Sequence, residues 1–149
     1  TARTALDLLP SDGEVVIAET SEALVRWNRT HVAHLAQRPL DDPRTRLAMG
    51  NVVEHIAASD SVYDALMLDV DNGPTALIID SNGRLYDRRG IEECVRALRP
   101  GGVLSVWSAF PSDDYLQRLR DAGLEAEAIT VPAGGTADYD HVIFLGKKT

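Results

Sequence analysis

The chain is organised around the stretch Tyr63-Asp64-Ala65-Leu66-Met67-Leu68-Asp69-Val70-Asp71-Asn72-Gly73-Pro74. Its first half predicts a β-strand over residues 65–68, with apolar side chains on both sides of the pleat. That pattern is typical of a strand in a parallel sheet that helices cover on both faces. Asp69 and Asp71 follow the strand, and ligands of open α/β sheets bind at the carboxyl ends of strands. We therefore expect a binding site at this point.

Strands and helices alternate on both sides of this stretch. Before it we expect helices over 1–9, from 22 to about 35, and over 52–57, with strands over 14–18 and 45–49. After it we expect a half-turn or short helix over 75–79, a turn at 80–83, helices over 87–98 and 111–122, and a strand over 103–107. Two final strands, 125–131 and 141–145, pair antiparallel across a glycine-rich loop, 132–140. The alternation predicts a doubly wound α/β sheet with right-handed crossovers.

The composition indicates one folded domain. The 149 residues are enough for a hydrophobic core, and no linker or repeat divides them, so we expect a single domain over residues 1–149. The net charge of −8 argues against a nucleic acid partner, because phosphate binding needs a basic face. The one cysteine, Cys94, excludes an internal disulfide and a multi-cysteine metal site, and its place on an apolar helical stripe predicts a core residue. No apolar run reaches the ~18 residues that a membrane span needs, so we expect a cytoplasmic protein.

An ordered set of motifs extends over nearly the whole chain. It comprises an acid that ends a strand (Glu19), Gly50-Asn51 after the next strand, the stretch 63–74, Leu85-Tyr86 before a helix, Leu98-Arg99-Pro100-Gly101-Gly102, and Ser108-Ala109-Phe110-Pro111. This set resembles the class I S-adenosylmethionine-dependent methyltransferases and, within that superfamily, the spermidine synthase-like aminopropyltransferases. The resemblance implies a Rossmann-like fold, with a mostly parallel sheet, helices on both faces and an antiparallel C-terminal strand pair.

The resemblance also implies that the domain is N-terminally incomplete in this chain. In the family, a first strand and a Gly-x-Gly-x-Gly loop precede the helix that begins here like Thr1-Ala2-Arg3. A sheet without that strand would expose unpaired backbone between its neighbours. We therefore expect either a rearranged sheet or a partner chain over the gap, and a homo-oligomer is left open.

The resemblance further implies a site for S-adenosylmethionine or decarboxylated S-adenosylmethionine as co-substrate, with no metal. Glu19 takes the position of an acid that accepts hydrogen bonds from both ribose hydroxyls; a solvated acid at a strand end is the alternative. Asn51 stands where the family usually has an Asp that contacts the adenine amino group, and an N-cap for the next helix is the alternative. Thr20, Val52 and Asp69 complete the expected co-substrate site.

The catalytic residues that the resemblance implies are Asp69 and Asp71. In aminopropyl transfer an amine attacks the methylene next to a sulfonium; the amine must lose a proton, and a carboxylate can take it and hold a flanking ammonium. The second acid of the family lies three positions after the first, at Asn72 here, whereas Asp71 lies two after. Trp107 stands where the family tends to have Gln. Asp71, Asn72 and Trp107 form the expected substrate site, and the two departures count against polyamine specificity.

The sequence therefore predicts a transferase that moves an aminopropyl group to a small amine. S-adenosylmethionine-dependent methyl transfer to a small molecule is the alternative, favoured by the changed second acid and by Trp107. A non-catalytic domain that has kept the fold is a second alternative, favoured by the absent glycine-rich loop. His31 and His34 are three apart on an expected helix, but a solvated face explains this spacing better than a metal site does.

Overall fold

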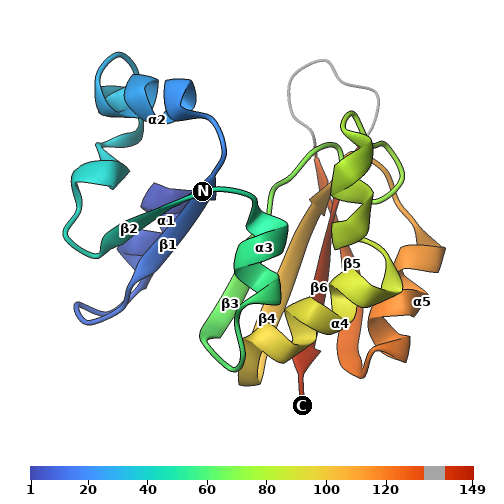
Figure 1. The fold of residues 1–149 in the computed structure, drawn as a ribbon. Helices are drawn as coiled ribbons and strands as arrows, with labels where there is room; N and C mark the ends of the chain where they lie inside the picture. Colours follow the sequence, from blue (N-terminus) through green and yellow to red (C-terminus); the bar gives the residue numbers. More distant parts are fainter. Residues whose placement is uncertain (133–139) are drawn as a thin grey trace. The chain divides into compact units, whose positions relative to one another are not determined.

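A computed structural model of the chain describes residues 1–132 and 140–149, so most of the predicted loop 132–140 lies outside the described residues. The chain divides into two compact units, Thr1–His55 and Ile56–Thr149 (Figure 1). Each unit has a sheet of its own, with two strands in the first and four in the second. The expectation of a single domain stays a prediction.

The first unit is built on two parallel strands. It contains α1 (Ala2–Leu8), β1 (Val15–Glu19), α2 (Glu22–Arg29), 3-10 turns at Ala33–Ala36 and Pro39–Asp41, β2 (Thr45–Met49) and the start of α3 (Val52–Ala57). Val15 lies opposite Thr45 and Glu19 opposite Met49, so both strands end at the same edge. The core is small, with Leu6, Val15 and Ala33 buried.

Helix α2 corrects one expectation. Ser21 caps it, its hydroxyl accepting from the Leu24 N–H at 3.2 Å, but the helix ends at Arg29 rather than near residue 35. The Thr30 hydroxyl donates to the Arg26 carbonyl at 2.7 Å at this end. The predicted apolar stripe is not buried either: Leu24 is 44% and Trp27 51% exposed. An amphipathic pattern shows which side chains need a partner surface, not that this unit supplies one.

The second unit holds a mixed sheet of order β3-β4-β6-β5. Its strands are β3 (Tyr63–Leu68), β4 (Leu98–Ser108), β5 (Leu124–Pro132) and β6 (Asp140–Lys148). β3 and β4 run parallel, and β6 runs antiparallel to both β4 and β5, so the predicted antiparallel terminal pair is confirmed. β1 and β3 belong to different sheets.

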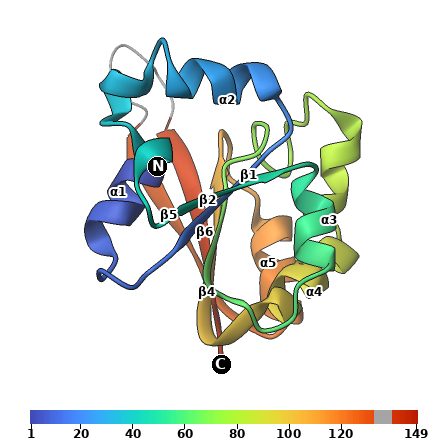
Figure 2. The same cartoon turned by 60° about the vertical axis from the view of Figure 1, so that its left-hand side comes forward.

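Helices α4 (Arg88–Ala97) and α5 (Asp113–Asp121) cover one face of this sheet (Figure 2). Side chains of β4 alternate accordingly: Leu104 and Val106 are buried, whereas Ser105 and Trp107 on the other face are half-buried. Cys94, as predicted, lies in the core. Near the end of β6, the Lys148 ammonium donates to two carbonyls at the end of α4, those of Val95 at 2.8 Å and Leu98 at 2.7 Å.

The expectation that β3 is covered on both faces is wrong. β3 is an edge strand, and Met67, which points away from the helices, is 50% exposed, whereas Leu68 is 4% exposed. An apolar run on both sides of the pleat marks what a strand can bury, but the neighbouring elements decide what it does bury.

Two local expectations around β3 are also corrected. The strand expected over 103–107 begins earlier, because β4 starts at Leu98 and includes residues 99–102; its register with β3 shifts between Leu98 and Val103. Residues 75–79 form no helix, and a 3-10 turn runs from Asp80 to Leu85 where a simple turn was expected.

Candidate functional site

The predicted co-substrate residues of the first unit lie at the carboxyl ends of β1 and β2. Glu19 ends β1, and its Oε1 accepts from the backbone N–H groups of Thr20 at 2.7 Å and Ser21 at 2.8 Å. The turn after the strand thus holds one carboxylate oxygen. The Gly50 N–H donates to the Glu19 carbonyl at 3.0 Å, which fastens the end of β2 to the end of β1.

Asn51 follows directly, so Glu19 and Asn51 come together at this edge. The Asn51 Oδ1 accepts from the Val53 N–H at 3.0 Å, which is the helix-capping arrangement that the sequence left open. Val52, the first residue of α3, is half-buried. An amide oxygen has two lone pairs, so capping leaves one acceptor position on Asn51.

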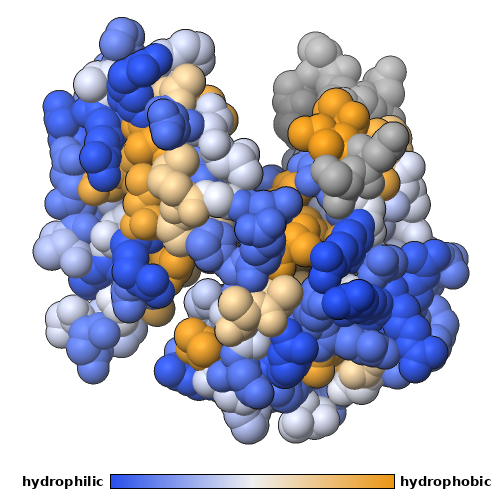
Figure 3. Space-filling model, in the orientation of Figure 1, coloured by the Kyte–Doolittle hydropathy of each residue, from blue (hydrophilic) through white to orange (hydrophobic). Residues whose placement is uncertain are grey.

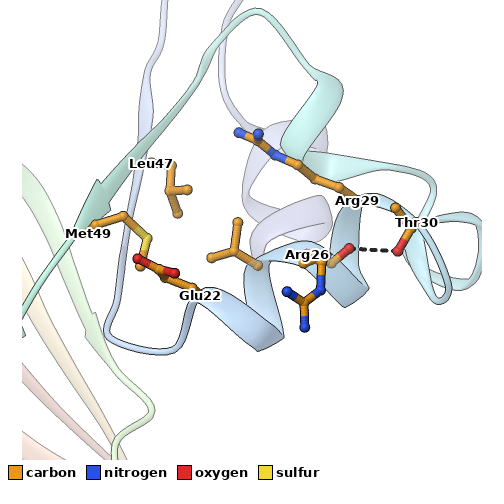
Figure 4. A pocket seen from close by; sticks show the side chains of 7 residues that line it. Glu22, Arg26, Arg29, Thr30, Leu47 and Met49 are labelled. Carbon is orange, nitrogen blue, oxygen red and sulfur yellow. Dashed lines mark hydrogen bonds between the residues drawn. The ribbon is translucent and has the colours of Figure 1, made fainter.

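A pocket of about 370 Å³ lies in the first unit between α2 and β2 (Figure 4). Its floor is apolar, formed by Val25, Leu47 and Met49. The guanidinium groups of Arg26 and Arg29 point in different directions (Figure 4). Specific small-molecule sites need convergent polar groups, and no residue of the expected site lines this pocket.

Asp69 and Trp107 occupy neighbouring positions in the second unit. Asp69 follows Leu68, Trp107 follows Val106, and Leu68 and Val106 are register partners on the parallel strands β3 and β4. The Asp69 side chain is exposed, and no described residue donates a hydrogen bond to it or forms an ion pair with it. The indole of Trp107 packs at a tilt on the His141 ring, with centroids 4.9 Å apart.

The Asp71 carboxylate differs from that of Asp69, because it accepts hydrogen bonds from residues of its own loop. Oδ1 accepts from the N–H groups of Asn72 at 3.0 Å and Ile78 at 2.7 Å. Oδ2 accepts from the Ile79 N–H at 3.0 Å and from the Asn82 side-chain amide at 3.2 Å. These hydrogen bonds, that from Ile79 foremost, hold the pKa of the Asp71 carboxyl below its usual value. Asp71 also has a left-handed backbone, with φ of 63°, which Asp tolerates better than most residues.

The loop after β3 is anchored at three further points. The Asn72 carbonyl accepts from the Ala109 N–H at 3.0 Å. Gly73, at φ 92°, packs against Ser108 so closely that a Cβ there would lie 2.7 Å from the Ser108 Cα. The Tyr86 hydroxyl donates to the Val70 carbonyl. Burial, and then the nearby carboxylates of Asp71 and Asp69, raise the pKa of Tyr86 to about 12, so this donor keeps its proton.

The sequence did not assign a role to Asn82 or to Tyr86. The Asp-Ser-Asn-Gly composition at 80–83 and the Leu85-Tyr86 pair were visible, but neither pattern shows which distant group the side chain reaches. Among the described residues, no group of three or more His, Cys, Asp and Glu side chains is arranged to hold a metal ion. The same residues include no helix with the length and apolar character required to cross a membrane.

The chain is similar in sequence to two groups of known transferases. No family model matches the chain. The chain is 32% identical over 107 residues to the polyamine aminopropyltransferase of Nitrosomonas europaea, an alignment that covers 69% of this chain and 31% of the relative. It is 32% identical over 104 residues to putrescine N-methyltransferase 1 of Nicotiana tabacum, covering 66% and 26%. The chain spans less than a third of the length of either relative.

Solved structures show the same fold. A spermidine synthase in complex with the transition-state analogue AdoDATO superposes with a TM-score of 0.79 at 18% identity, over 99% of this chain and 52% of that one. The precorrin-6y C5,15-methyltransferase of Geobacter metallireducens superposes with a TM-score of 0.67 at 18% identity, over 99% and 73%. The chain therefore has the Rossmann-like fold of the class I methyltransferase superfamily. Within that superfamily it is similar in sequence to the polyamine aminopropyltransferases, the spermidine synthase-like branch, as its motifs predicted.

Proposed function

We propose that the protein transfers an aminopropyl group from an S-adenosyl sulfonium donor to a small amine. The observation that carries the proposal is the unbonded carboxylate of Asp69 at the end of β3. The similarity to polyamine aminopropyltransferases supports it. A cytoplasmic location and a homo-oligomer stay predictions.

In this reaction the amine nitrogen forms a bond to the methylene carbon next to the sulfonium, and the carbon–sulfur bond breaks. The sulfur keeps the electron pair and leaves as the neutral thioether of methylthioadenosine. The attacking amine must first give up a proton, and Asp69 is the group that accepts it. Since no described residue bonds to it, both of its oxygens can accept from an ammonium.

We assign the binding of the S-adenosyl donor to Glu19 and Asn51. The turn after β1 engages only Oε1 of Glu19, which leaves Oε2 as an acceptor for a ribose hydroxyl. Asn51 retains one acceptor position for an amino group beyond its bond to the Val53 N–H. Thr20 and Val52 lie next to these two residues in the chain. The side-chain oxygens of Glu19 and Asn51 can accept hydrogen bonds from neutral hydroxyl and amino groups, which suits a nucleoside.

Methyl transfer to an amine is the second candidate. The similarity to putrescine N-methyltransferases favours it, because those relatives match about as many residues as the aminopropyltransferases do. In methyl transfer the by-product is S-adenosylhomocysteine, which carries a charged amino-acid group that methylthioadenosine lacks.

Calorimetric titration of the full-length protein with methylthioadenosine and with S-adenosylhomocysteine distinguishes aminopropyl transfer from methyl transfer. We expect tighter binding of methylthioadenosine; tighter binding of S-adenosylhomocysteine would favour methyl transfer, and no binding of either would contradict both. Glu19→Gln keeps an acceptor for the turn but replaces the second oxygen with an NH₂ group. Hydrogen bonds to charged groups contribute about 1.5–3 kcal/mol, so this variant should bind roughly 10- to 100-fold more weakly. Glu22→Gln removes the same charge three residues away and should leave binding unchanged.

A further inference from the structure

The loop that follows β3 carries two carboxylates, and only one of them is available. Both oxygens of Asp71 are occupied, by three backbone N–H groups and the Asn82 amide. A carboxylate offers about four lone-pair positions. Four donors therefore fill it, and an incoming ammonium would have to displace bonds that hold the loop together. Among the residues that the structure describes, Asp69 has no such partner.

Apolar side chains lie on the two segments that flank the Asp69 carboxylate, the loop after β3 and the end of β4. Trp107, which is half-buried, occupies the neighbouring position on β4, and an indole ring suits one ammonium or an alkyl chain. The loop that Asp71 holds exposes Ile78 at 75% and Ile79 at 57%, and Phe110, just past the end of β4, is 50% exposed. Figure 3 shows apolar surface at the end of this unit where that loop lies.

We propose that the amine acceptor carries a single positive charge on an apolar body, and that Asp71 is a positioning residue of the acceptor loop. This inference rests on the proposed aminopropyl transfer and narrows its substrate class. A diamine would bring a second ammonium to a site whose one free carboxylate already serves the reacting nitrogen. A second ammonium beside these apolar side chains would gain no pairing with a free carboxylate of this loop and would lose part of its hydration, whereas a methyl group in the same place gains contact with them.

A matched pair of acceptors tests the substrate class in the full-length protein. 1,4-Diaminobutane and n-pentylamine have the same chain length, and a terminal ammonium in the first is a methyl group in the second. With decarboxylated S-adenosylmethionine as donor and methylthioadenosine release as readout, we expect kcat/KM at least tenfold higher for n-pentylamine. Preference for the diamine would overturn this inference and leave aminopropyl transfer standing. Release with neither amine would contradict the proposed function, and this inference with it.

A matched pair of variants tests the role of Asp71 without relying on activity. In Asp71→Asn an NH₂ group replaces one acceptor oxygen, so the amides of Ile78 and Ile79 should exchange with solvent roughly tenfold faster, as the loss of about 1.4 kcal/mol implies. Asp69→Asn should abolish transfer and leave exchange at these two amides unchanged. Unchanged exchange in Asp71→Asn together with lost transfer would show that Asp71 acts on the substrate, and would overturn the positioning role.

Discussion

Two buried tyrosines in the second unit should respond in opposite directions to the loss of their hydroxyl groups. Tyr115 is 1% and Tyr86 2% exposed, and their rings meet edge to face with centroids 5.9 Å apart. The Tyr115 hydroxyl has no hydrogen-bond partner among the described residues, whereas the Tyr86 hydroxyl donates to the Val70 carbonyl. Burial raises the pKa of both phenols, so both are neutral at pH 7.

The free-energy changes follow from these partners. A buried polar group without a partner costs about 1–3 kcal/mol. Tyr115→Phe removes that penalty and keeps the ring contacts with Tyr86 and Phe144, so we expect stabilisation of about 1 kcal/mol. Tyr86→Phe leaves the Val70 carbonyl without its donor, and should destabilise by about 1–2 kcal/mol. The two variants should therefore differ by roughly 2–3 kcal/mol, although each loses one oxygen.

Equilibrium urea unfolding at pH 7 measures both changes against the wild type. If the free energy of unfolding falls with urea concentration at the same slope in all three proteins, the variants differ in stability and not in the unfolded state. If Tyr115→Phe destabilises as much as Tyr86→Phe, the Tyr115 hydroxyl does form a hydrogen bond, and the reasoning from its missing partner is wrong.

Three further changes should affect stability. Gly73→Ala places a Cβ against Ser108 at a backbone angle of φ 92°, and should lower the unfolding free energy by more than about 2 kcal/mol, measured by urea unfolding. Lys148→Met removes the ammonium from the end of α4 and should lower the free energy of unfolding by about 1–2 kcal/mol, seen as a lower melting temperature. Lys148→Arg keeps a cation at this position and should retain most of the wild-type stability. Hydrogen bonds from Arg44 lower the pKa of Asp42 from 3.8 to about 2. The stability from this pair is therefore complete above pH 3.8 and is lost as the pH falls toward 2; an acid titration of Asp42→Asn that shows the same loss in that window would refute this origin.

Local sequence patterns predicted the elements well where a single segment contains its own signals. The helices expected to begin near residues 22 and 111 do begin there, and Ser21 and Ser112 cap them by accepting from the N–H three residues on. Asp69 was placed at a strand end by the run of apolar residues before it. The predicted alternation of strands and helices needed no information from distant parts of the chain.

Side-chain contacts and burial that depend on other segments of the chain were not predictable. The carboxylate of Asp71 accepts from backbone N–H groups seven and eight residues further on, and neither the local sequence nor the family resemblance, which implies a catalytic role, indicated these hydrogen bonds. Trp27 belongs to an amphipathic pattern that predicts burial, yet it is 51% exposed, because burial requires a complementary surface. β3 likewise has a sequence fit for an interior strand and lies at the edge of its sheet.

The position of β6 between β4 and β5 determines when the sheet of the second unit can form during synthesis. During synthesis from the N-terminus, β4 and β5 emerge before the strand that joins them, so neither can close its hydrogen-bond ladder on that side. Residues 140–148 complete both ladders at once and bring Lys148 to the end of α4. A ribosome that stalls before this segment releases a nascent chain with two unsatisfied strand edges, a form that quality-control proteases and chaperones recognise. Deletions at this end should therefore reduce the yield of folded protein far more than their length suggests.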